Sequence, residues 1–450
     1  MEYAEGAVGR PSSLISRRRL LRNAGVVAAS LPLATTLLSE TNVAGAQLLR
    51  RNQLESSSSA TIQFLDLPYD TNTIPLYQAA ATAFQKMTGV HVDISQVSWG
   101  SAYPKFLSLI AAHATPALSV FGPKWLPQFI SLGALEPLDK YLSSSFLAKF
   151  PSSLLKQLTF NGHLWALPEA LSTRMMFYRK DLFKAAGIGS PPRTWKELLS
   201  AAEKLNDPPH HYGLVMQGQG DEMIWWYTYF LYGAAGSYLN GAGKWAVNQP
   251  QAVRALQFEA DLANRFKVTQ PDVAGTGINT AQELLVKGQA AMYWGPPWII
   301  AQFQSQNPSL LKDIGVTYYP TLSGTPAPLF IQDVFVIWQG APNPKEIARF
   351  LEFWNQNSYQ EKFNKVEQLI PVTTPVGRAP YFRDNPLLQR FIQAIPHAKS
   401  YPVKDGFSTV NTAMDTAIAK ALLGTSAKVA LDEAQSTIVR QLGTALAAKA

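Results

Sequence analysis

The chain of 450 residues contains no cysteine. This absence excludes thiol catalysis, disulfide bonds and cysteine-based zinc or iron–sulfur sites, and we expect no lipoprotein anchored through an acylated thiol. Charged residues are scarce at 16%, against 47% hydrophobic residues, which is typical of a globular protein rather than a disordered one. At this length, two domains are expected.

Motifs for several other functions are missing as well. No glycine-rich phosphate loop of the P-loop kind occurs, so ATP hydrolysis would belong to partner chains. Lys plus Arg exceed Asp plus Glu by 39 to 31, but the excess is scattered and forms no basic stripe interleaved with aromatics, which argues against nucleic acid binding. Of the histidines only His210 and His211 are neighbours, and adjacent side chains point apart. We expect no metal and no cofactor.

An arginine cluster opens the segment SRRRLLRNAGVVAASLPLATTLL, Ser16–Leu38, and an apolar stretch follows it. That order is typical of a signal peptide, and Arg17-Arg18 followed by leucines resembles a twin-arginine signal. The alternative is a membrane anchor, but the apolar stretch falls short of the roughly 20 residues that a span needs.

Small residues at Ala44-Gly45-Ala46 fit a cleavage site. We therefore interpret residues 1–46 as an export signal and residues 47–59, with their serine run, as a flexible lead. This predicts a protein in the periplasm or at the outer face of the cytoplasmic membrane of a bacterium.

From Ala60 onward, short β-like runs alternate with longer helical ones. TIQFLDL reads as a strand, Pro75 to Lys86 as a helix that ends at Gly89, and VHVDISQV as the next strand. Repetition of this order predicts βαβ units, a largely parallel sheet and the α/β fold class.

Two later helices carry start signals. Thr194 and Glu197 form a capping box ahead of an apolar stripe. Asn343, Pro344 and Glu346 are predicted to do the same for the helix that follows them.

The stretch MYWGPPWI, Met292 to Ile299, combines tryptophans and prolines without a charge. Because proline fixes φ and lacks an N–H, the stretch reads as a rigid turn after the helical run Thr280 to Gly288, rather than a central strand or a helix interior. Trp294 and Trp298 could form a buried corner, a membrane-interface belt or a flat apolar platform for a ligand.

FNGHLWALPEALSTRMMFYRKDLFKAAGIGSPPRTWKELLSAAEKL, Phe160 to Leu205, resembles the middle of the group 1 extracellular solute-binding proteins, the maltose-binding-like subunits of bacterial ABC sugar importers. TGVHVDI, KGQAAMYWGPPWI and LGTSAKVALDEAQSTIVRQL fit the same family in the expected order. The chain departs from it at Ala117-Leu118, where many members carry an acid, and at Gln332-Asp333, where glycines are frequent.

The resemblance implies an α/β, two-lobed periplasmic binding protein type II fold with discontinuous lobes and a hinged ligand cleft. Residues 60–167 plus 321–368 would form the N-terminal lobe, and residues 168–320 plus 369–450 the C-terminal lobe. Such lobes close around ligand by hinge rotation.

The resemblance also implies a sugar-binding receptor without catalysis. It would capture a mono- or oligosaccharide and deliver it to ABC transporter permease subunits, as a monomer. One alternative keeps the scaffold and binds a polyamine, metal or anion instead. Another is a secreted glycosidase, which would need two carboxylates at a fixed separation.

A sugar has an apolar face that an aromatic ring matches and a hydroxyl rim that carboxylates match. Trp298 stands at the tryptophan of the family's G-P-W turn, and Glu169 matches a family position that bonds sugar hydroxyls, unless it forms a plain hinge salt bridge. Trp225 and Trp226 are expected to split between cleft and interior. Trp294 could be platform or core, and Glu222 is a further candidate.

In the N-terminal lobe the candidates follow strands, because ligands collect beyond the carboxyl ends of parallel strands. A surface loop is the alternative for several of them. They are Tyr69, Asp70, Lys124, Trp125, Gln332 and Asp333.

Overall fold

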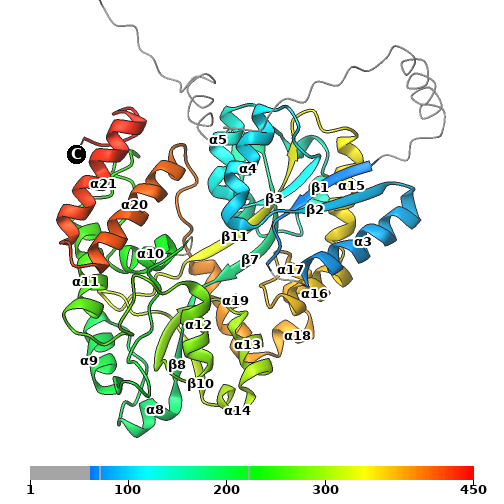
Figure 1. Cartoon of the computed structure of the whole chain (residues 1–450). Coiled ribbons are helices and arrows are strands. Elements are labelled where there is room, and N and C mark those ends of the chain that lie inside the picture. Colours follow the sequence, from blue (N-terminus) through cyan, green and yellow to red (C-terminus); the bar gives the residue numbers. More distant parts are fainter. Residues whose placement is uncertain (1–60, 70–71, 221–222, 450) are drawn as a thin grey trace, which may run out of the picture. The chain divides into compact units, whose positions relative to one another are not determined.

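The computed structural model describes residues 61–69, 72–220 and 223–449. The predicted export signal and flexible lead lie outside the described residues. Helices and strands alternate along the rest, which confirms the α/β class (Figure 1). Within the described part, no helix is long and apolar enough to cross a membrane.

The first sheet has six strands in the order β2-β1-β3-β11-β4, and β7 also pairs with β11. Their bounds are β1 (Thr61–Asp66), β2 (His91–Gln96), β3 (Leu118–Phe121), β4 (Leu135–Glu136), β7 (Leu167–Thr173) and β11 (Phe330–Trp338). Strand β1 is parallel to β2 and β3, whereas β11 is antiparallel to β3, β4 and β7. The prediction of a largely parallel sheet is wrong, because β11 enters from a distant part of the chain and runs against its neighbours.

The second sheet is antiparallel throughout, in the order β10-β8-β9. It consists of β8 (Met175–Arg179), β9 (Met292–Gly295) and β10 (Ile314–Thr317), and a separate hairpin pairs β5 (Thr159–Phe160) with β6 (His163–Leu164). The stretch MYWGPPWI therefore begins as an edge strand rather than as a turn. Its prolines then lead into α13 (Ile299–Gln306).

The remaining helices fall into two groups along the chain. The earlier ones are α3 (Thr73–Thr88), α4 (Trp99–Ala111), α5 (Leu126–Ser131), α6 (Ser144–Leu147), α7 (Ser152–Gln157), α8 (Lys180–Ala185), α9 (Trp195–Leu205), α10 (Met223–Gly233), α11 (Pro250–Asn264) and α12 (Ile278–Val286). The later ones are α14 (Pro308–Leu311), α15 (Pro344–Trp354), α16 (Asn357–Val366), α17 (Thr374–Gly377), α18 (Pro380–Arg383), α19 (Pro386–Ala394), α20 (Phe407–Leu422) and α21 (Ala427–Leu442). Short 3₁₀ turns are η2 (Pro123–Trp125), η3 (Leu138–Lys140) and η4 (Ile395–His397).

Helix boundaries test the predicted signals. Gly89 ends α3 in the left-handed conformation, at φ 77°, which glycine adopts without a Cβ penalty. The capping box of Thr194 and Glu197 is present at the start of α9. Helix α15 also forms where expected, but Asn343 has a φ of 53° and its side chain makes no cap. The capping prediction for Asn343 is therefore wrong, because its backbone turns away from the extended conformation that a cap requires.

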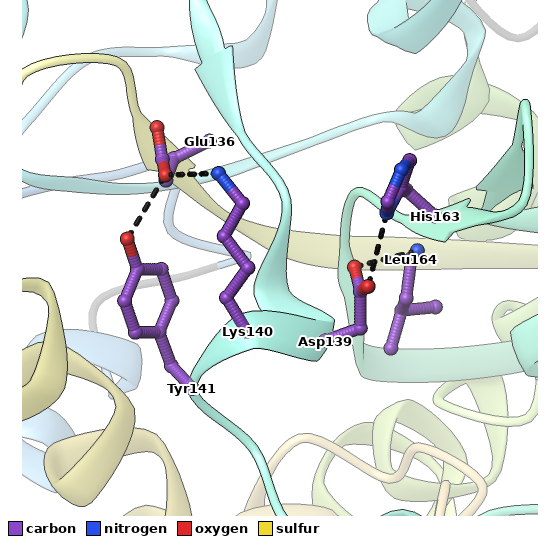
Figure 2. Close-up of polar contacts among 6 residues, drawn as sticks. All are labelled: Glu136, Asp139, Lys140, Tyr141, His163 and Leu164. Carbon is purple, nitrogen blue, oxygen red and sulfur yellow. Dashed lines mark hydrogen bonds and ion pairs between the residues drawn. The ribbon is translucent and has the colours of Figure 1, made fainter.

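Polar side chains fasten the β5–β6 hairpin to the turn η3, as Figure 2 shows. His163 and the backbone N–H of Leu164 contact the carboxylate of Asp139, at 3.0 and 3.1 Å. On the other side of the turn, Lys140 and Tyr141 both donate to Glu136. These contacts are exposed or partly buried, and they stabilise a local connection.

Helix α10 is buried along its whole length and packs against α11 and α20. In α11, Glu259 is completely buried, and among the described residues neither of its carboxylate oxygens has a hydrogen-bond partner. Burial raises the pKa of Glu259 well above its ordinary value of 4.5. The folded protein therefore keeps a proton on this carboxyl group.

Glu259→Gln removes the titrating carboxyl group. The variant should therefore become more stable relative to the unchanged protein as pH rises. The unfolded chain loses its Glu259 proton near the ordinary pKa and the folded chain only at higher pH, so the free energy of unfolding falls between those two pKa values, by about 1.4 kcal/mol per pH unit. We expect Glu259→Gln to raise the urea midpoint more at about pH 8 than at about pH 5.

The matched control is Glu203→Gln, at an exposed position of α9. It should change stability by a similar small amount at both pH values. An equal effect of Glu259→Gln at both would contradict the assignment of a buried, protonated carboxyl group.

Candidate functional site

A bulge in the pairing of β7 with β11 brings two acids together. Asp333 pairs with Ala170, but Val334 pairs with Pro168, so Glu169 is the extra residue on its strand. Pro168 has no N–H to donate to the ladder, which favours such an irregularity at this point. The bulge turns Glu169 into the interior, where it is completely buried.

Two tyrosine hydroxyls contact the Glu169 carboxyl group. Tyr77 donates to Oε1 at 2.6 Å, and the hydroxyl of half-buried Tyr69 lies 2.6 Å from Oε2. The same Tyr69 hydroxyl lies 2.8 Å from Asp333 Oδ2. One hydroxyl hydrogen cannot serve both carboxylates, so one of the two acids must carry a proton of its own.

Burial is the main reason why the pKa of Glu169 lies well above its ordinary value, and the nearby Asp333 and Asp66 raise it further. The hydrogen bonds from Tyr69 and Tyr77 act in the opposite direction. Glu169 is thus the acid that keeps a proton. Half-exposed Asp333 is then the member of the pair that a ligand could reach.

Two further acids lie behind this pair. Burial raises the pKa of Asp66 to about 7, and Glu367 adds to the effect while a backbone hydrogen bond from Leu67 opposes it. Glu367 accepts a hydrogen bond from Thr73 at 2.9 Å. We call Asp66, Glu169, Asp333 and Glu367 the acid cluster.

An aromatic surface adjoins the acid cluster. The rings of Tyr69 and Trp99 lie 6.1 Å apart between centroids, and both residues are half-exposed. A Cβ built on Gly122 would lie 3.9 Å from Trp99, which is ordinary contact distance, so Gly122 borders this ring. Sequence reasoning missed Trp99, although it follows the predicted strand VHVDISQV just as Tyr69 follows TIQFLDL.

Lys124 and Trp125 follow β3 in the turn η2. The Lys124 ammonium lies 5.6 Å from the centroid of Trp125 and 5.7 Å from that of Trp225, which comes from α10. Trp225 is buried and also contacts Tyr401, at 4.4 Å between centroids. We call Lys124, Trp125 and Trp225 the lysine cage.

Trp298 is half-exposed at the turn between β9 and α13. The guanidinium of buried Arg174 lies over it, 4.9 Å from the ring centroid, and donates to Ser172 at 2.6 Å. Arg174 joins β7 to β8 and was not singled out from the sequence, although it stands inside the stretch that carries the resemblance.

Other sequence candidates lie in the interior. Trp226 and Trp294 pack against each other with centroids 4.8 Å apart, and both are buried. Trp225 and Trp226 contact different partners, Tyr401 and Trp294, but both side chains are buried. Gln332 is buried and its amide lies 3.3 Å from Gln157.

Among the described residues, Glu169 has no salt-bridge partner at the crossing between the sheets; Tyr69 and Tyr77 contact it instead. Asp70 and Glu222 lie outside the described residues. Within the ranges that the structure describes, no group of His, Asp and Glu is arranged to hold a metal ion.

The candidate site as a whole offers aromatic faces, a reachable carboxylate and a cation, which together suit ligand binding.

Comparison with known proteins agrees with this architecture. The family described as bacterial extracellular solute-binding protein matches residues 70–361. A protein of Brucella abortus, described as a binding protein, is 27% identical over 372 residues, 82% of this chain and 90% of the relative. The maltotriose-binding protein of Pyrococcus abyssi is 26% identical over 309 residues, 65% of this chain and 62% of the relative.

Among solved structures, an ABC transporter solute-binding protein of Thermotoga lettingae, bound to α-D-tagatose, is similar with a TM-score of 0.76. It is 24% identical, and the match covers 86% of this chain and 100% of that one. This likeness confirms the predicted two-lobed fold. Since the family profile matches most of the chain, the chain belongs to the bacterial extracellular solute-binding protein family.

Proposed function

We propose that the protein is a sugar receptor, which captures a mono- or oligosaccharide between two lobes and delivers it to an ABC transporter. The observation that carries the proposal is the grouping of half-exposed Tyr69 and Trp99 beside Asp333. Aromatic rings match the apolar face of a sugar, and a carboxylate accepts from its hydroxyl rim. Trp298 would supply a second stacking face.

The relatives support the same ligand class. The Pyrococcus abyssi protein binds maltotriose, and the Thermotoga lettingae structure holds tagatose. A receptor with a micromolar Kd would need about 8 kcal/mol of binding free energy, which one or two stacked rings and several hydroxyl contacts could share.

In this proposal, residues 60–167 plus 321–368 form the N-terminal lobe, and residues 168–320 plus 369–450 the C-terminal lobe. The second sheet falls wholly within residues 168–320, which supports the division. The protein would act as a monomer outside the cytoplasmic membrane, without a lipid anchor, and would hand its ligand to permease subunits.

Removing the Trp298 ring should weaken or abolish sugar binding, because the stacking face is lost while the proline turn remains. We expect a thermal-shift screen of the protein against mono- and oligosaccharides to give a saturable shift with one sugar class, which Trp298→Ala abolishes. Polyamines, metal ions and inorganic anions serve as comparison ligands.

The control variant is Trp165→Ala, which removes another half-exposed indole. The Trp165 N–H donates to the Phe160 carbonyl oxygen at 3.0 Å, and Trp165 is not one of the proposed stacking residues. It should retain the shift. A shift with a cation or inorganic anion but with no sugar would refute the carbohydrate function.

Asp333→Asn keeps the shape of the side chain and removes its charge, so the hydrogen bonds that it accepts are no longer charge-assisted. We expect the Kd for the sugar to rise about tenfold, equivalent to about 1.4 kcal/mol, in isothermal titration calorimetry. Asp93→Asn, at an exposed position of β2, is the control and should leave the Kd unchanged. Unchanged affinity in Asp333→Asn would remove Asp333 from the site.

Export can be tested separately through Arg17 and Arg18. A twin-arginine signal should not tolerate lysines at both positions, so the double substitution should trap the precursor in the cytoplasm. Cell fractionation followed by immunoblotting measures this. Normal secretion of the variant would exclude the twin-arginine interpretation.

A further inference from the structure

Lys124 is a half-buried cation beside which the described part of the chain places no acid. Among the described residues, no carboxylate lies within ion-pair distance of its ammonium, which contacts only the rings of Trp125 and Trp225. Lys365 provides a contrast, because it lies over Tyr381 and also pairs with Glu361 at 2.7 Å. Within the described part of the chain, Lys124 therefore lacks the counter-charge that a partly buried cation ordinarily acquires.

The surroundings of Lys124 favour a ligand rather than a packing role. Its stem lies beside Gly122, and a Cβ at that glycine would meet both Lys124 and Trp99 within 4 Å. Gly122 thus lies between the stem of Lys124 and the ring of Trp99, one of the half-exposed rings proposed to stack on a sugar. Indole faces hold a cation weakly and in a fixed place, so they position the charge without neutralising it.

We propose that Lys124 binds an anionic substituent of the ligand, so that the receptor takes an acidic carbohydrate whose ring stacks beside the cage and whose carboxylate or phosphate pairs with the ammonium. The inference rests on the proposed carbohydrate function and narrows its substrate class. A ligand anion would supply the ion-pair partner that the described residues do not provide.

A cationic ligand is disfavoured at this position, because the Lys124 ammonium already fills the cage and would repel a second positive charge. The acid cluster does not alter this reasoning. Glu169 is occupied by Tyr69 and Tyr77, and no member of the cluster forms an ion pair with Lys124.

Matched ligand pairs test the proposal by isothermal titration calorimetry on the purified protein. Galacturonate is compared with galactose, glucose 6-phosphate with glucose, and glycerol 3-phosphate with glycerol. We expect the anionic member of at least one pair to bind about tenfold or more tightly than its neutral partner at low ionic strength, with the preference reduced by added salt. Whether the carboxylate or the phosphate pair responds identifies the source of the charge.

Lys124→Met keeps the length of the stem and should bring the ratio of the two Kd values to about one, whereas Lys124→Arg keeps the charge and should retain the preference. Lys149→Met is the matched control, because Lys149 also lies over a ring, that of Phe146, but at an exposed position. It should retain the preference.

Each outcome decides the proposal. Equal binding of neutral and anionic members, or a preference that survives Lys124→Met, overturns the role of Lys124 and leaves the sugar receptor standing. Binding of no member of any pair, nor of any sugar in the thermal-shift screen, overturns the carbohydrate function and this inference together.

Discussion

The pairing of β7 with β11 is the constraint on which the candidate site depends. These strands meet although they are far apart in the sequence, and a bulge at Glu169 aims that acid inward while Asp333 stays half-exposed. A regular ladder would alternate side chains between the two faces, and neither acid would then share the Tyr69 hydroxyl. The β-bulge at Glu169 thus brings Glu169 and Asp333 together in the acid cluster.

Hydroxyl groups donate to several of the buried acids in the cluster. Tyr69 and Tyr77 satisfy Glu169, and Thr73 satisfies one oxygen of Glu367. Repulsion is limited further because the pKa of Glu169 is raised by burial, so that it stays neutral. Asp333, which is half-exposed, is then the member of the pair that lies at the side of the cluster that a ligand can approach.

Local patterns in the sequence predicted local structure well. The strand β1, the helix α3 with its Gly89 end, and the capped helix α9 follow from periodicity and caps that neighbouring residues determine. The direction of β11 could not be predicted in this way, because strand pairing depends on contacts between distant residues. The strand-end rule pointed to Tyr69 and, had it been applied to β2, would have found Trp99 as well.

The side-chain environments were beyond sequence reasoning for the same reason. Trp226 and Trp294 read as plausible stacking faces, but each fills the core because the other covers it. Lys124 owes its cage to Trp225, which no spacing rule connects to it. The Asp333 carboxyl group lies on β11, next to the residue that pairs with Phe121 at the end of β3, and the Lys124 ammonium follows β3 in η2. A neutral sugar would use only the Asp333 carboxyl group. A sugar with an acidic substituent would also use the Lys124 ammonium, and this favours a ligand that combines a hydroxyl rim with an anion.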